Sequence, residues 1–162
     1  MKSSKISRYG LLIALAFILS YVEALIPPPV PIPGIKLGLA NLVVLAGLYA
    51  MGVKEAFVLS FIRIILVGLT FGNMSTMLFS LAGGILSWLV MALLKQVKGF
   101  SQVGVSVAGG VSHNIGQIIT AIFVTENINI IYYLPFLLLS GLITGAVIGV
   151  LGAMIIKRIK KL

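Results

Sequence analysis

The sequence predicts an all-α membrane protein, a bundle of six transmembrane helices with both chain termini in the cytoplasm. Mean hydropathy is +1.20 and 9% of the residues are charged, whereas about a quarter of the residues of a soluble domain are charged. Long apolar runs alternate with short polar or proline-rich connections, and such runs are typical of membrane-spanning helices. The basic residues lie between and beyond these runs, which is the orientation signal of a membrane protein.

Each predicted span ends where the composition changes. The first span ends at Pro27–Gly34, because proline cannot continue a helix. We interpret this span as retained, since no small-residue cleavage site precedes the prolines. The second span is the shortest, and Asn73 is placed to cap the start of the fourth. The spans, which form one integral membrane domain over residues 1–162, are 9–26, 37–51, 54–71, 74–94, 103–125 and 132–156.

The charged connections predict the orientation in the membrane. One side carries Lys2, Lys5, Arg8, Lys54, Lys95, Lys98, Lys157, Arg158, Lys160 and Lys161, and the other side carries Lys36. The positive-inside rule then places both termini in the cytoplasm, which requires an even number of spans. We therefore expect a multi-pass protein of the bacterial cytoplasmic (inner) membrane. The net charge of +9 does not indicate nucleic-acid binding, because the basic residues do not share one face of a polar domain.

The composition excludes most covalent chemistry. The chain has three Glu, no Asp, no Cys and one His. It has no P-loop motif and no paired acidic motif for magnesium. We therefore expect neither an enzyme nor a metal or cofactor site, but a protein that binds or moves a molecule in a membrane. Transport driven by ATP would need partner chains.

Arg63 lies near the middle of the third predicted span. A charge at that depth costs about 2.5–3.5 kcal/mol on insertion scales, so its side chain should face the interior of the bundle. Two roles are equally supported. Arg63 could anchor an anionic or carbonyl-rich ligand, or it could form a structural pair with Glu23.

The densest polar cluster within a span is Ser112–Gln117. His113 and Gln117 share a helix face with Asn114 beside them. Neutral hydrogen-bonding groups suit an uncharged ring or a carbonyl ligand. The alternative is hydrogen bonding between helices, worth about 0.6 kcal/mol per contact. We favour a cavity role, because three amide or imidazole groups lie within five residues.

Small residues at four-residue spacing occur in two spans. Gly141, Gly145 and Gly149 form a row in the sixth, and Gly10 and Ala14 form a pair in the first. Such spacing lets helix backbones approach closely. For the row we favour packing within the bundle. For the pair, internal packing and docking of a partner helix are equally supported.

The motifs PGIKLGLAN (Pro33–Asn41) and SHNIGQ (Ser112–Gln117) resemble the Gx transporter family, often labelled heptaprenyl diphosphate synthase component I. The whole pattern resembles the substrate-capture (S) components of energy-coupling factor (ECF) transporters. The resemblance implies capture of a small vitamin-like molecule or an isoprenoid or quinone precursor, with a T subunit and ATPase subunits as partners. Gly10 and Ala14 would dock the T subunit. Because they are polar residues within or beside the predicted spans, we expect Arg63, His113, Asn114 and Gln117 to bind this substrate, with Lys36 and Asn41 in a gating loop.

Two other hypotheses stay open. The chain could be a non-catalytic membrane accessory subunit of a prenyl diphosphate synthase, since it lacks the Asp-rich motifs of the catalytic chains. A solitary secondary transporter is less well supported, because Glu23 is the carboxylate available within a span for proton coupling.

Overall fold

The computed structural model describes residues 2–26 and 37–159, which form six α-helices and one 3₁₀ helix. The predicted proline-rich segment and Lys36 lie outside the described residues. The elements are α1 (Lys2–Leu25), α2 (Leu39–Ala50), α3 (Val53–Thr70), α4 (Met74–Leu94), α5 (Gln102–Thr125), η1 (Ile128–Tyr133) and α6 (Leu134–Ile159).

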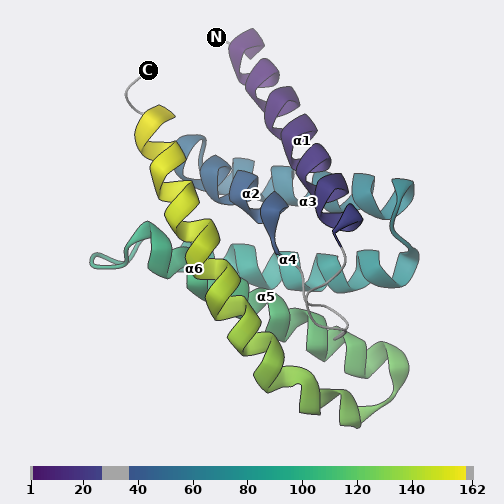
Figure 1. Ribbon diagram of the computed structural model, residues 1–162. Helices are drawn as coiled ribbons and strands as arrows, with labels where there is room; N and C mark the ends of the chain where they lie inside the picture. The colour runs from purple at the N-terminus through teal and green to yellow at the C-terminus, as the bar shows by residue number, and fades with distance from the viewer. Residues whose placement is uncertain (1, 27–36, 160–162) are drawn as a thin grey trace.

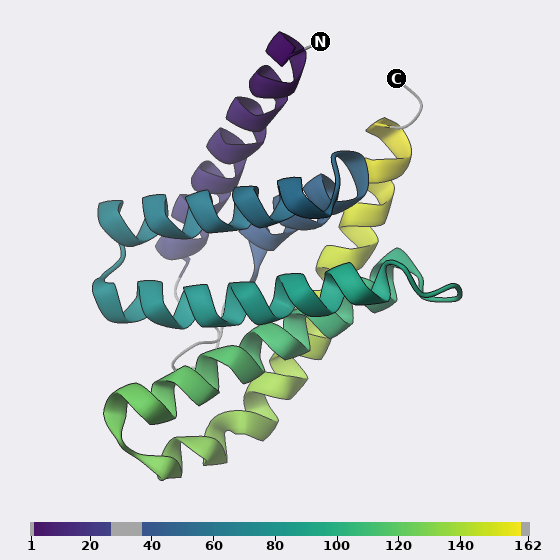
Figure 2. The ribbon, with the colours of Figure 1, turned by 180° about the vertical axis from the view of Figure 1, so that it is seen from behind.

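The helices form two layers that cross at a steep angle (Figure 1). One layer holds α3, α4 and α5 side by side, as the view from behind shows (Figure 2). The other layer holds α1, α2 and α6, with α2 in contact with both of its neighbours. Each helix of the second layer therefore has one face toward the first layer, and the space between the layers is where polar side chains can be enclosed.

Local chemistry sets several helix boundaries. The predicted cap at Asn73 is confirmed: its Oδ1 accepts a hydrogen bond from the backbone N–H of Thr76 at 2.8 Å, and the hydroxyl of Thr76 accepts one from the backbone N–H of Asn73 at 3.0 Å. The last helix begins at Leu134, after the 3₁₀ turn, and not at residue 132 as predicted. Pro135 explains this start, because proline is tolerated in the first turn of an α-helix but not further inside.

Within the described part of the chain, four helical segments are long and apolar enough to cross a membrane: Ile6–Leu25, Met74–Leu94, Gln102–Thr125 and Ile128–Arg158. The described part of the chain is therefore helical throughout its regular structure, with several helices of the kind that cross membranes. α2 has 12 residues and spans about 18 Å, which is shorter than a bilayer core of about 30 Å. α3 carries Lys54, Glu55 and Arg63, which lower its hydropathy. Six spans were predicted, but α2 is too short and α3 is too charged to be recognised as a membrane span by itself.

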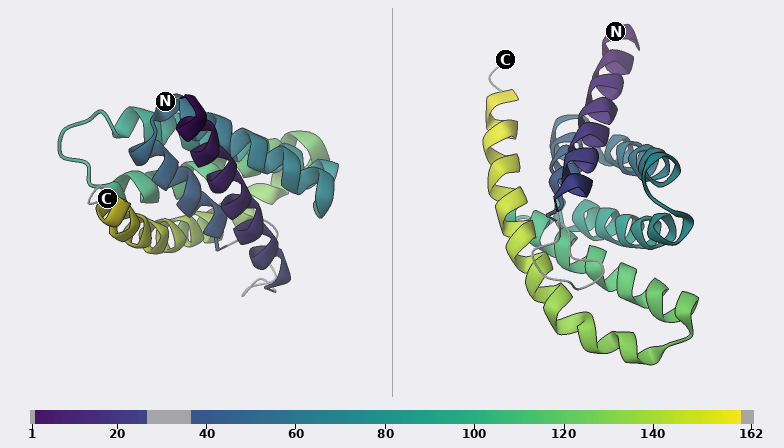
Figure 3. Two further views of the ribbon diagram at one scale, coloured as in Figure 1. Left: turned by 90° about the horizontal axis from the view of Figure 1, so that it is seen from above. Right: turned by 45° about the vertical axis from the view of Figure 1, so that its right-hand side comes forward.

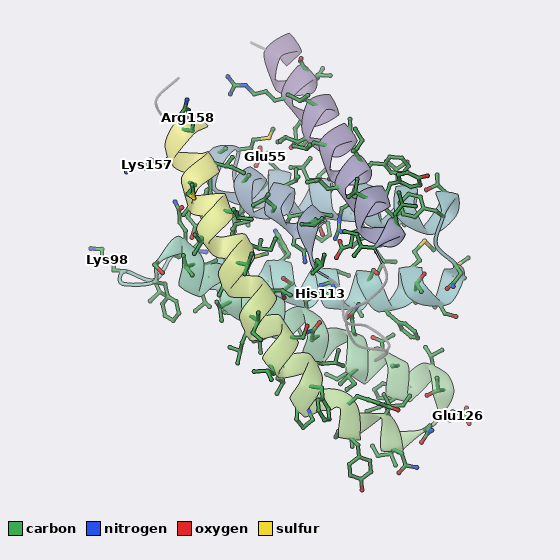
Figure 4. All side chains as sticks on the ribbon, viewed as in Figure 1. Glu55, Lys98, His113, Glu126, Lys157 and Arg158 are labelled. Carbon is green, nitrogen blue, oxygen red and sulfur yellow. The ribbon has the colours of Figure 1, made fainter. Side chains whose placement is uncertain are left out.

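Charge is unevenly distributed between the two ends of the bundle. Lys98, Lys157 and Arg158 lie near one end and Glu126 lies at the other (Figure 4). The start of α1 and the end of α6 both lie toward this end of the bundle, as a ribbon view also shows (Figure 3). This arrangement is the one that the positive-inside rule predicts for two termini on the same side of a membrane.

Glycine allows α5 to contact both of its neighbours backbone to backbone. A Cβ atom built on Gly145 of α6 would lie 2.7 Å from the Cα of Val107, and one on Gly141 would lie 2.9 Å from the carbonyl oxygen of Gly110. On the other side of α5, a Cβ on Gly116 would lie 2.9 Å from the carbonyl oxygen of Ala82. The glycine row of α6 is therefore an internal packing surface, as predicted, and α4, α5 and α6 form one closely packed unit.

Candidate ligand-binding site

A small polar cavity lies at the centre of the bundle, between the two helix layers. Its volume is about 60 Å³, and residues from all six α-helices or from the turns that begin them contribute to its wall. The lining residues are Glu23, Gly38, Asn41, Arg63, Ser80, Gly110, His113, Asn114, Gln117 and Thr144. A cavity that collects charged and amide side chains inside an apolar bundle is a candidate site for a polar ligand.

The residues predicted to bind substrate meet at this cavity, although they are far apart in the sequence. Asn41, Arg63 and the three polar residues of α5 all line it, and Lys36 lies outside the described residues. Sequence analysis missed Ser80, Gly110 and Thr144. Serine, glycine and threonine are common at contacts between membrane helices, so no signal in the sequence marked these three as cavity residues.

Arg63 reaches from α3 toward the start of α2. Its Nη2 donates a hydrogen bond to Oδ1 of Asn41 at 3.3 Å. Glu23, at the end of α1, accepts a hydrogen bond from the backbone N–H of Gly38 at 2.5 Å. No ion pair within 4 Å joins Glu23 to Arg63 in the described structure, and each makes its own hydrogen bond to the beginning of α2, although Glu23 still attracts Arg63 electrostatically.

Gly38 makes the contact with Glu23 possible. Its φ of 75° lies in the left-handed region, which glycine adopts without the steric cost of a side chain. This conformation directs the backbone N–H of Gly38 toward α1 immediately before α2 begins. The carboxylate of Glu23 therefore holds the N-terminal end of α2 against α1, beside the cavity.

Two polar atoms of the cavity lack partners among the residues that the structure describes. They are Nε of Arg63, a hydrogen-bond donor, and Oε1 of Gln117, an acceptor, and both are buried. The side chain of Gln117 is 8% exposed. A buried polar group without a partner costs about 1–3 kcal/mol, so each of these two atoms, which no described residue partners, is a candidate contact for water or a ligand.

The other two polar residues of α5, Asn114 and His113, line the cavity and also contribute to the packing between helices. Nδ2 of Asn114 donates a hydrogen bond to the carbonyl oxygen of Leu137 at 2.5 Å, which connects α5 to the first turn of α6. His113 lies near the centre of the molecule (Figure 4). A Cβ built on Gly83 would lie 3.0 Å from Cε1 of the His113 ring, so Gly83 leaves room for the imidazole between α4 and α5.

The arrangement suits binding more than bond-breaking chemistry. Within the described ranges, no group of three or more His, Cys, Asp or Glu side chains could hold a metal ion. Drug-sized ligands occupy pockets of about 300–1,000 Å³, so this cavity in its present closed form holds a few water molecules or one polar group. Binding of a larger molecule requires the helices around the cavity to separate.

The predicted docking pair lies away from the cavity on the outer surface of α1. A Cβ built on Gly10 would meet no atom within 4 Å, and Ala14 is exposed. The neighbouring Ala16 is 1% exposed and Ser20 is buried, so the opposite face of α1 is the one that packs on the bundle. Gly10 and Ala14 therefore have no packing role within the described chain.

Comparison with known proteins identifies one family. The family model described as heptaprenyl diphosphate synthase component I matches residues 12–155 of the chain. No curated protein matches the chain, and no solved structure matches it. The match agrees with the expectation that this chain is not itself the catalyst, because the description is that of one component of a synthase.

Proposed function

We propose, from the premise that the chain belongs to the heptaprenyl diphosphate synthase component I family, that it captures a small molecule in the cavity between its helix layers. The observation that carries this proposal is that Nε of Arg63 and Oε1 of Gln117 are buried and no described residue partners them, on a cavity lined by residues from across the bundle. Burying such groups is costly, and a ligand that satisfies both would recover that cost on binding.

In finer detail, we propose that the chain is the S component of an ECF-type transporter. The chain has no P-loop, so ATP-driven uptake would require ATPase subunits and a T subunit. The exposed surface of α1 around Gly10 and Ala14 supports a docking role, because small residues let a partner helix approach closely and nothing in the described chain covers them. The substrate would be a vitamin-like molecule or an isoprenoid or quinone precursor.

The proposed orientation of the bundle in the membrane rests on the same charge distribution that the sequence shows. We place the end with Lys98, Lys157, Arg158 and both termini in the cytoplasm of a bacterium, with Glu126 on the outside of the inner membrane. Glu23 and Gly38 then lie toward the outer side of the cavity, and a substrate would enter beside the start of α2.

The first test is co-purification of the tagged protein from its native membranes in mild detergent, with partners and retained small molecules identified by mass spectrometry. We expect recovery of a T subunit and paired ATPases, together with a small molecule. Recovery of a prenyl synthase without those subunits would contradict the transporter role.

The second candidate function is a non-catalytic membrane subunit of a prenyl diphosphate synthase. The description of the family favours it, because it names a component of such a synthase. The chain would then recruit a soluble catalytic partner to the membrane and hold a prenyl chain there. Loss of synthase activity from the membrane fraction on deletion of this chain, with uptake of vitamins unchanged, would distinguish it from the transporter.

A further inference from the structure

A second, narrower cavity continues from the polar one toward the basic end of the bundle. Its volume is about 30 Å³. The two cavities share four lining residues, Gly38, Asn41, Gly110 and Thr144. A shared wall from α2, α5 and α6 means that the two form one elongated crevice.

The positions along α5 give the length and direction of this crevice. Gln117 lines the polar cavity, Gly110 lines both, and Ser106 lines the narrow one. Eleven residues separate Gln117 from Ser106, which corresponds to about 16 Å along a helix. The crevice therefore runs along α5 from the side of Glu126 toward the side of Lys98, with His113 between them (Figure 4).

The chemistry of the wall changes along this length. The outer part contains both charged residues, Glu23 and Arg63, together with amides and the imidazole. The inner part contains no charged residue among its described lining, and its side chains are mainly those of Leu45, Met91 and Ile148, with small residues between them. The crevice thus has a hydrogen-bonding end and an apolar end.

The outer end specifies a head group that both donates and accepts hydrogen bonds. Nε of Arg63 requires an acceptor, and Oε1 of Gln117 requires a donor. The described wall there has one guanidinium and one carboxylate, so its charges offset each other. Among the described lining residues, a diphosphate with at least two negative charges would meet one guanidinium beside one carboxylate, whereas a hydroxyl or an amide would be matched.

We propose that the ligand is an amphiphile with an uncharged, hydrogen-bonding head at Arg63 and Gln117 and a single narrow apolar tail beside Leu45, Met91 and Ile148. The proposal rests on the proposed function, since it names the class of molecule that the same site takes. Apolar surface of the tail buried against these side chains would supply affinity, and the head would supply orientation.

Entry of such a molecule requires the crevice to widen, and the structure indicates which wall moves. α5 contacts both α4 and α6 through glycine backbones, so separating these three helices would lose close packing. The beginning of α2 is joined to α1 and α3 by the hydrogen bonds of Gly38 to Glu23 and of Asn41 to Arg63, whereas the rest of the helix is buried in the core. These two bonds can exchange for bonds to water or ligand, so we expect the beginning of α2 to move while the rest of α2 and α4, α5 and α6 stay packed.

The test compares three probes on the purified protein in lipid nanodiscs, with empty nanodiscs subtracted. Farnesol has a neutral alcohol head and one apolar tail, prenol has the same head on a short tail, and farnesyl diphosphate has the farnesol tail on a charged head. We expect saturable farnesol binding at least about tenfold tighter than that of either other probe. Tighter binding of farnesyl diphosphate, or no saturable farnesol binding, would overturn the proposal.

Substitutions in the inner cavity test where the apolar tail of the ligand lies. Ser87→Val narrows the inner cavity and should weaken farnesol binding by about tenfold without changing prenol binding. The matched control is Ser112→Val, a buried serine that lines neither cavity. If Ser87→Val does not fold, Leu45→Ala should weaken farnesol binding selectively, with Leu59→Ala as its control. Equal effects of test and control variants would overturn the placement of the tail.

The outcomes separate this inference from the function on which it rests. A small molecule recovered from native membranes with the wild-type protein, but without a tail or with a charged head, would refute the amphiphile and leave the capture function standing. The absence of any retained molecule, of any partner transport subunit and of binding by all three probes would refute both.

Discussion

The glycine row of α6 and the small-residue pair of α1 have the same spacing but opposite surroundings. The row at Gly141, Gly145 and Gly149 contacts the backbone of α5 so closely that a Cβ on Gly145 would lie 2.7 Å from the Cα of Val107. A Cβ on Gly10 would meet nothing within 4 Å. The spacing shows that a helix can be approached closely, whereas only the packed structure shows whether the chain itself supplies the approaching helix.

The largest expected effect is that of Gly145→Leu. The side chain would have to displace the backbone of α5, so we expect a loss above the range of about 1–3 kcal/mol that is common for overpacked cores. Thermal unfolding in detergent, followed by size-exclusion fluorescence, would show little or no folded protein. A variant as stable as the wild type would contradict the internal role of the row.

The next largest effect is expected for Arg63→Ala. It removes the buried donor at the cavity and the hydrogen bond to Asn41, so retention of the native small molecule should fall about tenfold or more, which is about 1.4 kcal/mol. Mass spectrometry of extracts from the purified protein measures this loss. Thr120→Val is the control, because that hydroxyl bonds to the carbonyl of Gly116 within α5. Equal retention by both variants would contradict ligand contact by Arg63.

A smaller effect is expected at the start of α4. Asn73→Ala removes a side chain that accepts a hydrogen bond from Thr76, and losing such a cap costs about 1 kcal/mol. The melting temperature should fall slightly, with ligand retention unchanged. Asn73→Asp should restore most of the lost stability, since aspartate caps helices equally well.

The smallest effect on stability is expected for Gly10→Leu. The added side chain meets no atom of the described chain, so the melting temperature should be close to that of the wild type. Recovery of a partner membrane subunit should nevertheless fall, because a large side chain prevents close approach of another helix. A strongly destabilised Gly10→Leu protein would contradict the outward position of this pair. Unchanged partner recovery would contradict its docking role.

Much of the secondary structure could be predicted because each helix carries its own signal. Apolar runs between basic or proline-rich connections gave helix bounds within a few residues for α2 to α5, and Asn73 was recognised as a cap from its position alone. Arg63, His113, Asn114 and Gln117 of the cavity were also recognised, because a charged, amide or imidazole side chain is rare within an apolar run. These features depend on neighbours along the chain, and the sequence by itself determined them.

The tertiary structure alone decided which helix faces meet. Helical periodicity specifies the face on which Gly145 or Ser80 lies, but not the helix that covers that face. The hydrogen bonds of Glu23 to Gly38 and of Arg63 to Asn41 join residues 15 and 22 positions apart, which no pattern along the chain indicated. Ser80, Gly110 and Thr144 became cavity residues only because close glycine contacts fix α4, α5 and α6 at distances that no local pattern records.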